Sequence, residues 1–345
     1  MEKQFKVLQV GCGGISNAWI PHVQAREDVR FVGAVDIQLK SAEAMTAKYG
    51  LDCPAFTDLA AALRDTGANL VIDNTIPESH HQVVTAALRA GCDVFGEKPL
   101  AGTLDDARDM VRTAKETGHS YSVMQNRRFI KNNRSFQKIV QSGIIGQPGF
   151  IQSDFFIGAH FGGFRDLMES PLLLDMAIHT FDQARFVTGA DALSVYCQEF
   201  NPPGSWYKGN AGATAIFEFS NGMVYTYSGS WCATGCNTSW ECFWRVSGTG
   251  GSACWDGEGA PWYEIPGTGN DPASFIWKTG KVTPEPNWEG HDGHQGCIDE
   301  MFAALLEGRK AETDCADNIH SLAMVLAAME SAKTGQKVKI DLQEV

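Results

Sequence analysis

The chain lacks any hydrophobic run that approaches the roughly 20 apolar residues needed to span a membrane. It is also poor in basic residues, with 28 Lys and Arg against 41 Asp and Glu and a formal net charge of -13. This deficit argues against a nucleic-acid partner, because phosphate binding needs a basic surface. The amino terminus has no basic segment followed by an apolar core, so no signal peptide is indicated and we expect a cytoplasmic protein.

A complete metal-binding set is missing as well. Cys232 and Cys236 resemble half of a zinc site, but no second Cys or His pair completes a tetrahedral set. The ten cysteines are scattered, and in a long chain without a signal sequence we interpret them as buried thiols rather than disulfides. The sequence therefore predicts no metal site, and it contains no internal repeat or low-complexity tract.

A glycine-rich turn near the amino terminus follows a short apolar strand. The segment Gly11-Cys-Gly-Gly-Ile-Ser16 lies between this strand and a helix that begins near residue 17. Gly11 permits a tight turn, Gly13 lets the backbone approach a pyrophosphate, and the helix amino terminus supplies amide donors. Ser16 replaces a third glycine and is small enough for close helix packing. The context is that of a dinucleotide-binding fingerprint.

The residue at the end of the next strand indicates which dinucleotide binds. Asp36 closes a strand over residues 30–36, and a carboxylate there accepts hydrogen bonds from adenosine ribose hydroxyls. It would repel a 2′-phosphate, and Lys40 is the only nearby cation. The sequence thus favours NAD over NADP.

Strands and helices continue to alternate up to residue 125. The pattern predicts a doubly wound parallel sheet, a Rossmann domain, over residues 1–125. The expected later elements are helices over 40–49, 58–65, 80–90 and 103–117, and strands over 69–73, 93–96 and 120–124.

The remaining residues, 126–345, predict a second domain for substrate binding and oligomerisation. A helix over 131–142 precedes strands that alternate apolar and polar residues, and Asn221-Gly222 indicates a hairpin between two of them. This α+β domain would have a large open, mainly antiparallel sheet, with residues 266–290 as an irregular loop. We expect one aromatic face of the sheet to form a subunit interface, as a dimer or tetramer. The aromatic residues assigned to that face are Tyr225, Tyr227, Trp231, Trp240 and Trp244.

The tripeptide Glu97-Lys98-Pro99 follows a short apolar strand of the first domain. Open α/β sheets bind ligands at the carboxyl ends of their strands, so Lys98 is expected at the mouth of the cofactor crevice. A lysine held there can donate to a substrate hydroxyl or carry a proton. A surface turn without a function is the alternative interpretation.

Asp175, His179 and Asp182 have the spacing i, i+4, i+7, which places them on one face of a largely apolar helix. In one interpretation His179 is a structural core histidine and Asp182 a cap. In the other, the neutral imidazole takes the proton of a substrate hydroxyl as hydride leaves, and Asp175 fixes the substrate or tunes the imidazole. A metal site is a third and weaker possibility.

These motifs resemble the glucose–fructose oxidoreductase, inositol dehydrogenase and rhizopine-catabolism family (Gfo/Idh/MocA). The resemblance covers nearly the whole chain and implies an NAD(P)-dependent oxidoreductase of sugars, cyclitols or polyols. The catalytic residues that it implies are Lys98, Asp175 and His179. The motifs that carry it are Gly11–Ser16, Asp36, Thr75-Ile-Pro77 with His80, Glu97–Pro99, Gln125–Phe129 and Asp175-x3-His179-x2-Asp182.

The resemblance also implies which residues contact the cofactor and the substrate. Arg127 and Arg128 are candidates for the substrate cleft, with an interdomain salt bridge as the alternative. Independently of the resemblance, the aromatic, histidine and arginine composition of residues 155–165, which include Phe155, His160 and Arg165, suits a loop over a sugar. For His291 and His294 a structural role is favoured over a cleft contact. The implied cofactor residues are Gly11, Gly13, Gly14, Ile15, Asp36, Thr75, Pro77, His80, Glu97, Lys98 and Asn126.

Three functions follow from this sequence. The leading hypothesis is reversible NAD-dependent oxidation of a sugar, inositol or related polyol. The second is a glycosidase or lyase that oxidises a sugar transiently with the same residues and returns the hydride. The third is an NAD-binding regulator without turnover, which the joint presence of Lys98, Asp175 and His179 disfavours.

Overall fold

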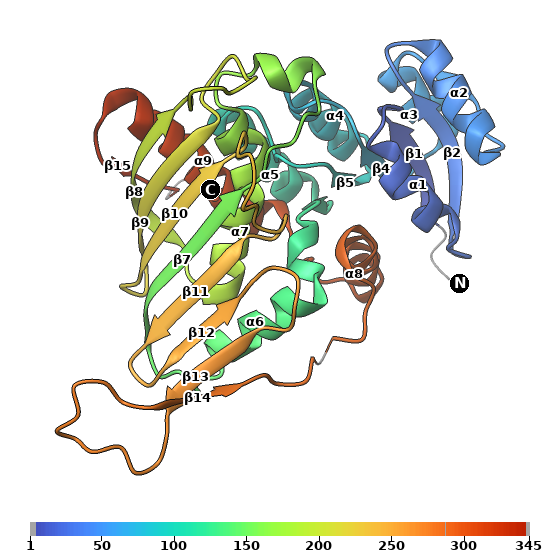
Figure 1. Cartoon of the computed structure of the whole chain (residues 1–345). Helices are drawn as coiled ribbons and strands as arrows, with labels where there is room; N and C mark the ends of the chain where they lie inside the picture. The colour runs from blue at the N-terminus through green and yellow to red at the C-terminus, as the bar shows by residue number, and fades with distance from the viewer. Residues whose placement is uncertain (1–4, 287, 343–345) are drawn as a thin grey trace. The chain divides into compact units, whose positions relative to one another are not determined.

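The computed structural model describes residues 5–286 and 288–342. The chain divides into two compact units (Figure 1). The first unit contains residues up to Asn126 together with His291–Leu322, and the second contains Arg127–Gly290 and Ala323–Leu342. The predicted boundary near residue 125 assigned everything after it to the second domain. In the structure, His291–Leu322 pack with the first unit instead, because apolar side chains such as Phe302 contact Phe5 and Phe95 there.

The first unit is built on a six-stranded parallel sheet with the order β3-β2-β1-β4-β5-β6. This order is that of the Rossmann fold, and it confirms the fold class predicted for the amino-terminal part. The strands are β1 (Phe5–Val10), β2 (Val29–Val35), β3 (Ala55–Phe56), β4 (Leu70–Asp73), β5 (Asp93–Gly96) and β6 (Tyr121–Val123). The helices are α1 (Ser16–Gln24), α2 (Leu39–Tyr49), α3 (Leu59–Thr66), α4 (Pro77–Arg89), α5 (Leu104–Thr117), α8 (Gly293–Glu307) and the first part of α9 (Cys315–Thr334).

The helix ends follow the local sequence. The Asp58 carboxylate accepts a hydrogen bond from the Ala61 amide at the start of α3, and the Thr103 hydroxyl accepts one from the Asp106 amide at the start of α5. Glycines in the left-handed region end both helices, Gly67 with φ 58° and Gly118 with φ 72°. These ends set the short connections that return the chain to the parallel sheet.

The second unit is built on a nine-stranded sheet with the order β14-β13-β12-β11-β7-β10-β9-β8-β15. All neighbouring strands are antiparallel except β7 and β10, so the prediction of a mainly antiparallel sheet is confirmed. The strands are β7 (Pro148–Phe156), β8 (Ala192–Phe200), β9 (Gly212–Phe219), β10 (Val224–Ser230), β11 (Phe243–Gly248), β12 (Ser252–Trp255), β13 (Trp262–Pro266), β14 (Thr279–Val282) and β15 (Val338–Lys339). The helical elements are η1 (Asn126–Phe129), α6 (Lys131–Gln141), η2 (Gly163–Leu167), the π-helix η3 (Leu172–Ala177), α7 (Ile178–Thr188) and the rest of α9.

The hairpin signal at Asn221-Gly222 was correct. Gly222 has φ 81°, and β9 and β10 pair in antiparallel register on either side of it. The irregular loop predicted over 266–290 was wrong in part, because Thr279–Val282 form β14 and pair with β13. No alternation of apolar and polar residues marks β14, whose side chains are all exposed.

The aromatic residues assigned to an interface face inward instead. Tyr225, Tyr227, Trp231 and Trp244 are completely buried, and only Trp240 of the predicted set is exposed. Phe181 of α7 packs edge-on against Tyr227 with ring centroids 5.2 Å apart. Figure 1 shows α6 and α7 behind this sheet. A two-residue period separates the faces of a sheet but does not tell which face helices cover, and this explains the error.

Candidate active site: cofactor and substrate residues

The glycine-rich turn between β1 and α1 has the geometry that a dinucleotide needs. Gly11 has φ 82°, and a Cβ there would lie 2.6 Å from the backbone carbonyl of Asn74. A Cβ on Gly13 or Gly14 would meet nothing within 4 Å, so the surface beside the helix amino terminus is open to a ligand. Ser16 is buried, and its hydroxyl donates to the Gly13 carbonyl at 2.7 Å. The turn therefore fits a pyrophosphate group.

Asp36 is held directly beside this turn. One carboxylate oxygen accepts from the Cys12 amide at 2.9 Å and the other from the Gln38 amide at 2.9 Å. These bonds fix the carboxylate at the carboxyl end of β2, where an adenosine ribose is expected. The predicted position of Asp36 at the end of this strand is thus what the structure contains.

A group of polar side chains is centred on Asp73, the last residue of β4. The Asp73 carboxylate accepts from the Thr75 hydroxyl at 2.6 Å and is bonded to His80 Nδ1 at 2.8 Å, and both Asp73 and His80 are fully buried. Burial by itself would lower the pKa of His80, but the charge of Asp73 and its hydrogen bond outweigh burial and raise the pKa. His80 is held in place by Asp73, a partner that the sequence analysis did not identify. Pro77 occupies the first turn of α4, where the missing amide hydrogen costs little.

Several buried polar atoms near these strand ends have no hydrogen-bond partner among the residues that the structure describes. They are His80 Nε2, Asn74 Nδ2, both side-chain polar atoms of Gln125, and Asn126 Oδ1. Buried polar atoms are nearly always satisfied in folded proteins, so these groups are available to a polar ligand. They support the fit of this unit to a nucleotide cofactor.

Glu97 and Lys98 follow β5, as the sequence predicts. The buried Glu97 carboxylate accepts from the Trp19 indole at 2.7 Å and from the Lys98 amide at 3.3 Å. His294 of α8 lies close enough for its pKa to be affected by both residues. Burial lowers the pKa of His294, Glu97 opposes this and Lys98 adds to it, and the net shift favours the neutral imidazole. His294 Nδ1 is 3.3 Å from the Asn126 amide nitrogen.

Asp175 and His179 lie on one continuous helical segment of the second unit. The segment begins as a π-helix and continues as an α-helix. Asp175 belongs to the π-helix η3, and His179 lies in the first turn of α7. The prediction of a regular helix over these residues was therefore wrong for 172–177. Short π-helical segments occur frequently at functional sites, and nothing in the local sequence marks this one.

The Asp175 carboxylate forms an ion pair with Arg165. The Arg165 guanidinium donates to Asp175 at 2.6 Å, and its Cζ lies 4.7 Å from the Phe164 ring centroid. Asp175 is half-buried at this position. The structure thus brings together two residues, Arg165 and Asp175, that the sequence analysis assigned to substrate binding on separate grounds.

Arg127 and Arg128 have acidic partners within the second unit. Arg128 donates to both oxygens of Asp182 at 2.8 and 2.6 Å, and Arg127 lies 3.2 Å from Glu241. These contacts are not the interdomain salt bridge that was the alternative for the two arginines, because all four residues belong to the second unit. Substrate contact by either arginine stays a prediction, and Asp182 is a structural partner of Arg128, consistent with the non-catalytic interpretation of that aspartate.

The remaining predicted substrate residues lie among aromatic side chains. Phe155 is buried in β7 and lies 6.4 Å from the Trp240 ring centroid, so it is a poor candidate for direct contact. His160 stacks on Trp206 with centroids 3.6 Å apart. Phe161 is 57% exposed and lies 6.1 Å from Trp240. Trp206 and Trp240 were not predicted here, since both are distant in sequence from 155–165.

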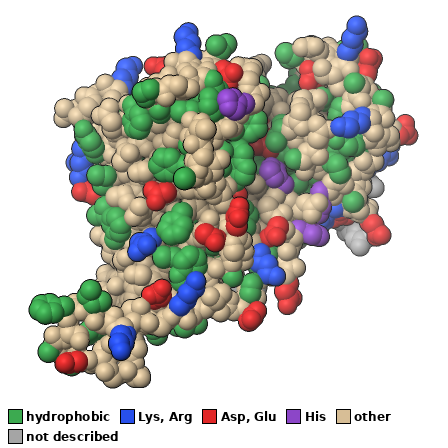
Figure 2. Space-filling view, in the orientation of Figure 1, with side chains coloured by type: hydrophobic (Ala, Val, Ile, Leu, Met, Phe, Trp, Pro, Cys, Tyr) green, Lys and Arg blue, Asp and Glu red, His purple; other side chains and the backbone are tan. Residues whose placement is uncertain are grey.

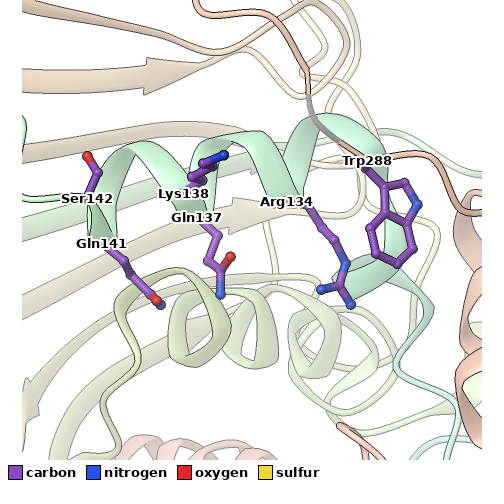
Figure 3. A pocket seen from close by; sticks show the side chains of 6 residues that line it. All are labelled: Arg134, Gln137, Lys138, Gln141, Ser142 and Trp288. Carbon is purple, nitrogen blue, oxygen red and sulfur yellow. The ribbon is translucent and has the colours of Figure 1, made fainter.

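A separate surface pocket of about 400 Å³ lies along α6 of the second unit. Figure 3 shows Arg134, Lys138 and their neighbours on the helix, with the Trp288 indole at one end. The Arg134 Cζ lies 4.2 Å from the centroid of the Trp288 ring, and this cation–π contact joins the helix to Trp288 at that end of the pocket. None of the predicted site residues lines this pocket.

The comparisons with known proteins establish the family. Residues 5–125 match the family model described as an oxidoreductase family with an NAD-binding Rossmann fold, and residues 133–254 match that of the Gfo/Idh/MocA carboxyl-terminal domain. The chain belongs to the Gfo/Idh/MocA family of oxidoreductases. It is accordingly an enzyme with an NAD-binding Rossmann domain, and the resemblance noted in the sequence is confirmed.

Relatives at low identity span the whole chain. An uncharacterized protein of Sinorhizobium fredii is 28% identical over 97% of this chain and 96% of its own length. The D-apiose dehydrogenase of Rhizobium rhizogenes is 27% identical over 98% of both chains. A solved oxidoreductase of Agrobacterium radiobacter, in complex with NAD+, L-tartaric acid and magnesium, superposes with a TM-score of 0.85 at 23% identity and 98% coverage of both chains, which shows a shared fold.

No helix among residues 5–286 and 288–342 is both long and apolar enough to cross a membrane.

All ten cysteines are thiols rather than disulfides, and five of them are buried.

Proposed function

We propose that this member of the Gfo/Idh/MocA family oxidises a secondary hydroxyl of a sugar, inositol or related polyol with NAD. The observation that carries the proposal is the segment after β5, where Lys98 follows the buried Glu97 and its amide donates to the Glu97 carboxylate. The whole-length similarity to a D-apiose dehydrogenase supports a carbohydrate substrate.

The proposal assigns one proton-transfer step to two side chains. His179 accepts the proton of the substrate hydroxyl, and the Lys98 ammonium donates a hydrogen bond to the same oxygen and stabilises the developing negative charge. Asp175 accepts from a neighbouring hydroxyl, and its ion pair with Arg165 holds the carboxylate in position. NAD supplies the acceptor for the hydride when it is bound.

Cofactor binding in this proposal uses the first unit. The amides around Gly13 and Gly14 bind the pyrophosphate with Ile15, and Asp36 binds the adenosine ribose and disfavours NADP. Thr75, Pro77 and His80 shape the cofactor side after β4. Glu97 and Asn126 contact the nicotinamide ribose, and Glu97 is positioned by the Trp19 indole at 2.7 Å.

A panel of sugars, inositols and other polyols with NAD, followed by absorbance of the reduced nicotinamide, tests the proposal. We expect turnover with at least one carbohydrate, and a strong loss of activity in Lys98→Ala and in His179→Ala. If both residues act on one proton transfer, the double variant loses no more than about the larger single effect. The control is Lys115→Ala, which removes a lysine from the exposed side of α5.

Other outcomes of this assay would replace the proposal. Release of an aglycone from a glycoside without accumulation of NADH would support the redox-neutral glycosidase or lyase. Folded protein that binds NAD but turns over no member of the panel, and that is unaffected by Lys98→Ala, would support the regulatory alternative. NADP turnover at least equal to NAD turnover would contradict the role of Asp36.

Self-association is also part of the proposal, through the outer face of the second unit's sheet. Strand register places Tyr196 opposite Ile216, and both are exposed, at 45% and 47%. Figure 2 shows hydrophobic side chains spread between charged ones over these strands. This face replaces the inward aromatic face in our interface hypothesis. Tyr196→Lys with Ile216→Lys is expected to reduce the oligomer to smaller species in light scattering, and an unchanged mass would contradict it.

A further inference from the structure

Two histidines and an aspartate converge in the first unit. His22 lies in the last turn of α1, His291 lies two residues before the start of α8, and Asp299 lies within α8. His22 Nε2 is 2.7 Å from one oxygen of Asp299, and His291 Nδ1 is 2.6 Å from the other. The candidate ligand atoms of the three residues all lie within 4.8 Å of one another. We name these three residues the His–Asp–His cluster.

We propose that the His–Asp–His cluster binds a divalent transition-metal ion of the zinc type. Two imidazole nitrogens and one carboxylate oxygen form a ligand set that suits zinc, and water would complete the tetrahedron. A tetrahedral ion with bonds of about 2.0–2.2 Å requires ligand atoms roughly 3.3–3.5 Å apart, so small side-chain rotations suffice to close the cluster. Magnesium prefers oxygen ligands and is not expected to bind.

The protonation of the cluster allows its hydrogen bonds to be replaced by bonds to a metal ion. In the hydrogen-bonded arrangement each imidazole presents an N–H to the carboxylate. When a metal binds, a neutral imidazole moves that proton to its other ring nitrogen and offers a lone pair in its place. The side chains of His291 and Asp299 are 62% and 37% exposed, so an ion can enter from solvent.

The position of the cluster gives the ion a structural consequence. Trp19, one turn before His22 on α1, donates to Glu97. His294, three residues after His291, lies beside Asn126, with its Nδ1 3.3 Å from the nitrogen of the Asn126 side-chain amide. An ion bound between α1 and the start of α8 would fix both of these contacts. The site is therefore expected to order the segment next to Lys98 without touching the substrate.

The sequence analysis predicted no metal site, and this cluster departs from that prediction. His22 lies far from His291 and Asp299 in the sequence, with almost the entire second unit between them. Packing of α1 against α8 brings them together. Spacing rules recognise ligands on one helix or loop and cannot recognise such a set.

The experiment is a titration of the protein with zinc. Calorimetry measures the affinity and the number of ions bound, and thermal denaturation measures the melting temperature with and without zinc. We expect one zinc ion per chain and a rise in the melting temperature that EDTA reverses, with no effect of magnesium. X-ray absorption at the zinc edge should show nitrogen and oxygen ligands at about 2.0–2.2 Å and no sulfur at about 2.3 Å. Sulfur ligands, or no saturable binding, would overturn the proposal.

Two variants and a matched control locate the ion. His291→Ala and Asp299→Asn should each weaken zinc binding by about tenfold or more, since even residues outside the ligand set commonly cost that much. The control is His81→Ala, because His81 is a partly exposed histidine that pairs with Asp109 at 2.8 Å but belongs to no such three-residue cluster among the residues that the structure describes. Unchanged affinity in both cluster variants, or an equal loss in the control, would show that the three residues form only a hydrogen-bonded group.

Discussion

The two units place their functional groups by different means. In the first unit, backbone geometry at the ends of parallel strands positions the cofactor residues, as with Gly11 in its left-handed turn and Asp36 held by two amides. In the second unit, side chains from separated segments position one another, as Arg165 does for Asp175. Backbone-defined sites leave a compact sequence motif, whereas a pairing such as that of Arg165 with Asp175 leaves none, although Asp175 and His179 themselves have a recognisable helical spacing.

The largest expected effect tests whether the second unit carries the proton transfer. His179→Ala should lower kcat by about 10²–10⁴-fold, the range typical for loss of a general base. NAD affinity should stay within error, because the cofactor residues belong to the first unit. Steady-state kinetics with the best substrate, together with an NAD titration by fluorescence, provide both values. A comparable loss of NAD affinity would show that the division between units is wrong.

The second prediction concerns the buried ion pair that supports α7. Arg128→Met should lower the free energy of unfolding by about 3 kcal/mol, because it leaves the Asp182 carboxylate buried without its bidentate partner. Urea denaturation measures the change. Arg112→Met, which removes an exposed arginine paired with Asp109, is the control and should leave the midpoint unchanged. Equal midpoints for the two variants would mean that the Arg128 pair is not essential to this unit.

A pair of glycine variants tests the backbone side of the comparison. Gly13→Ala should fold normally, since its Cβ meets nothing within 4 Å, yet bind NAD more weakly because the methyl occupies space for the pyrophosphate. Gly11→Ala should instead lower the melting temperature, because its Cβ would lie 2.6 Å from the Asn74 carbonyl at φ 82°. Calorimetry and thermal denaturation separate the two effects. The comparison fails if both variants lose only stability.

The smallest expected effect is a pH dependence in the second unit. Burial raises the pKa of Glu199 to about 7, while the Ser170 hydroxyl opposes the shift. Because the folded pKa is above the usual value, the neutral form is favoured on folding, and this contribution to stability is lost as the pH rises through about 7. Glu199→Gln should therefore flatten the fall in melting temperature between pH 4.5, the usual pKa of this carboxyl, and about pH 7, its pKa in the folded protein. An identical profile for the variant would contradict this role of Glu199.

Much of the first unit was predictable because its signals are local. Strand, glycine turn, helix and acidic residue occur in order within Phe5–Asp36, and the sheet is parallel as predicted. The second unit was predictable in its mainly antiparallel sheet and in the hairpin at Asn221-Gly222. Its π-helix, its strand β14 and the orientation of its aromatic face were not, since each depends on packing against distant segments.

The sequence by itself determined the fold class, the family and the identity of Lys98, Asp175 and His179 as candidate catalytic residues, because short-range patterns encode strand ends and helix faces. Only the tertiary structure decided that Arg128 pairs with Asp182, that Tyr225 and Trp244 face helices, and that His22 meets His291 and Asp299. These outcomes depend on contacts between residues far apart in the chain. Such contacts are selected by the packing of whole elements, which no local pattern contains.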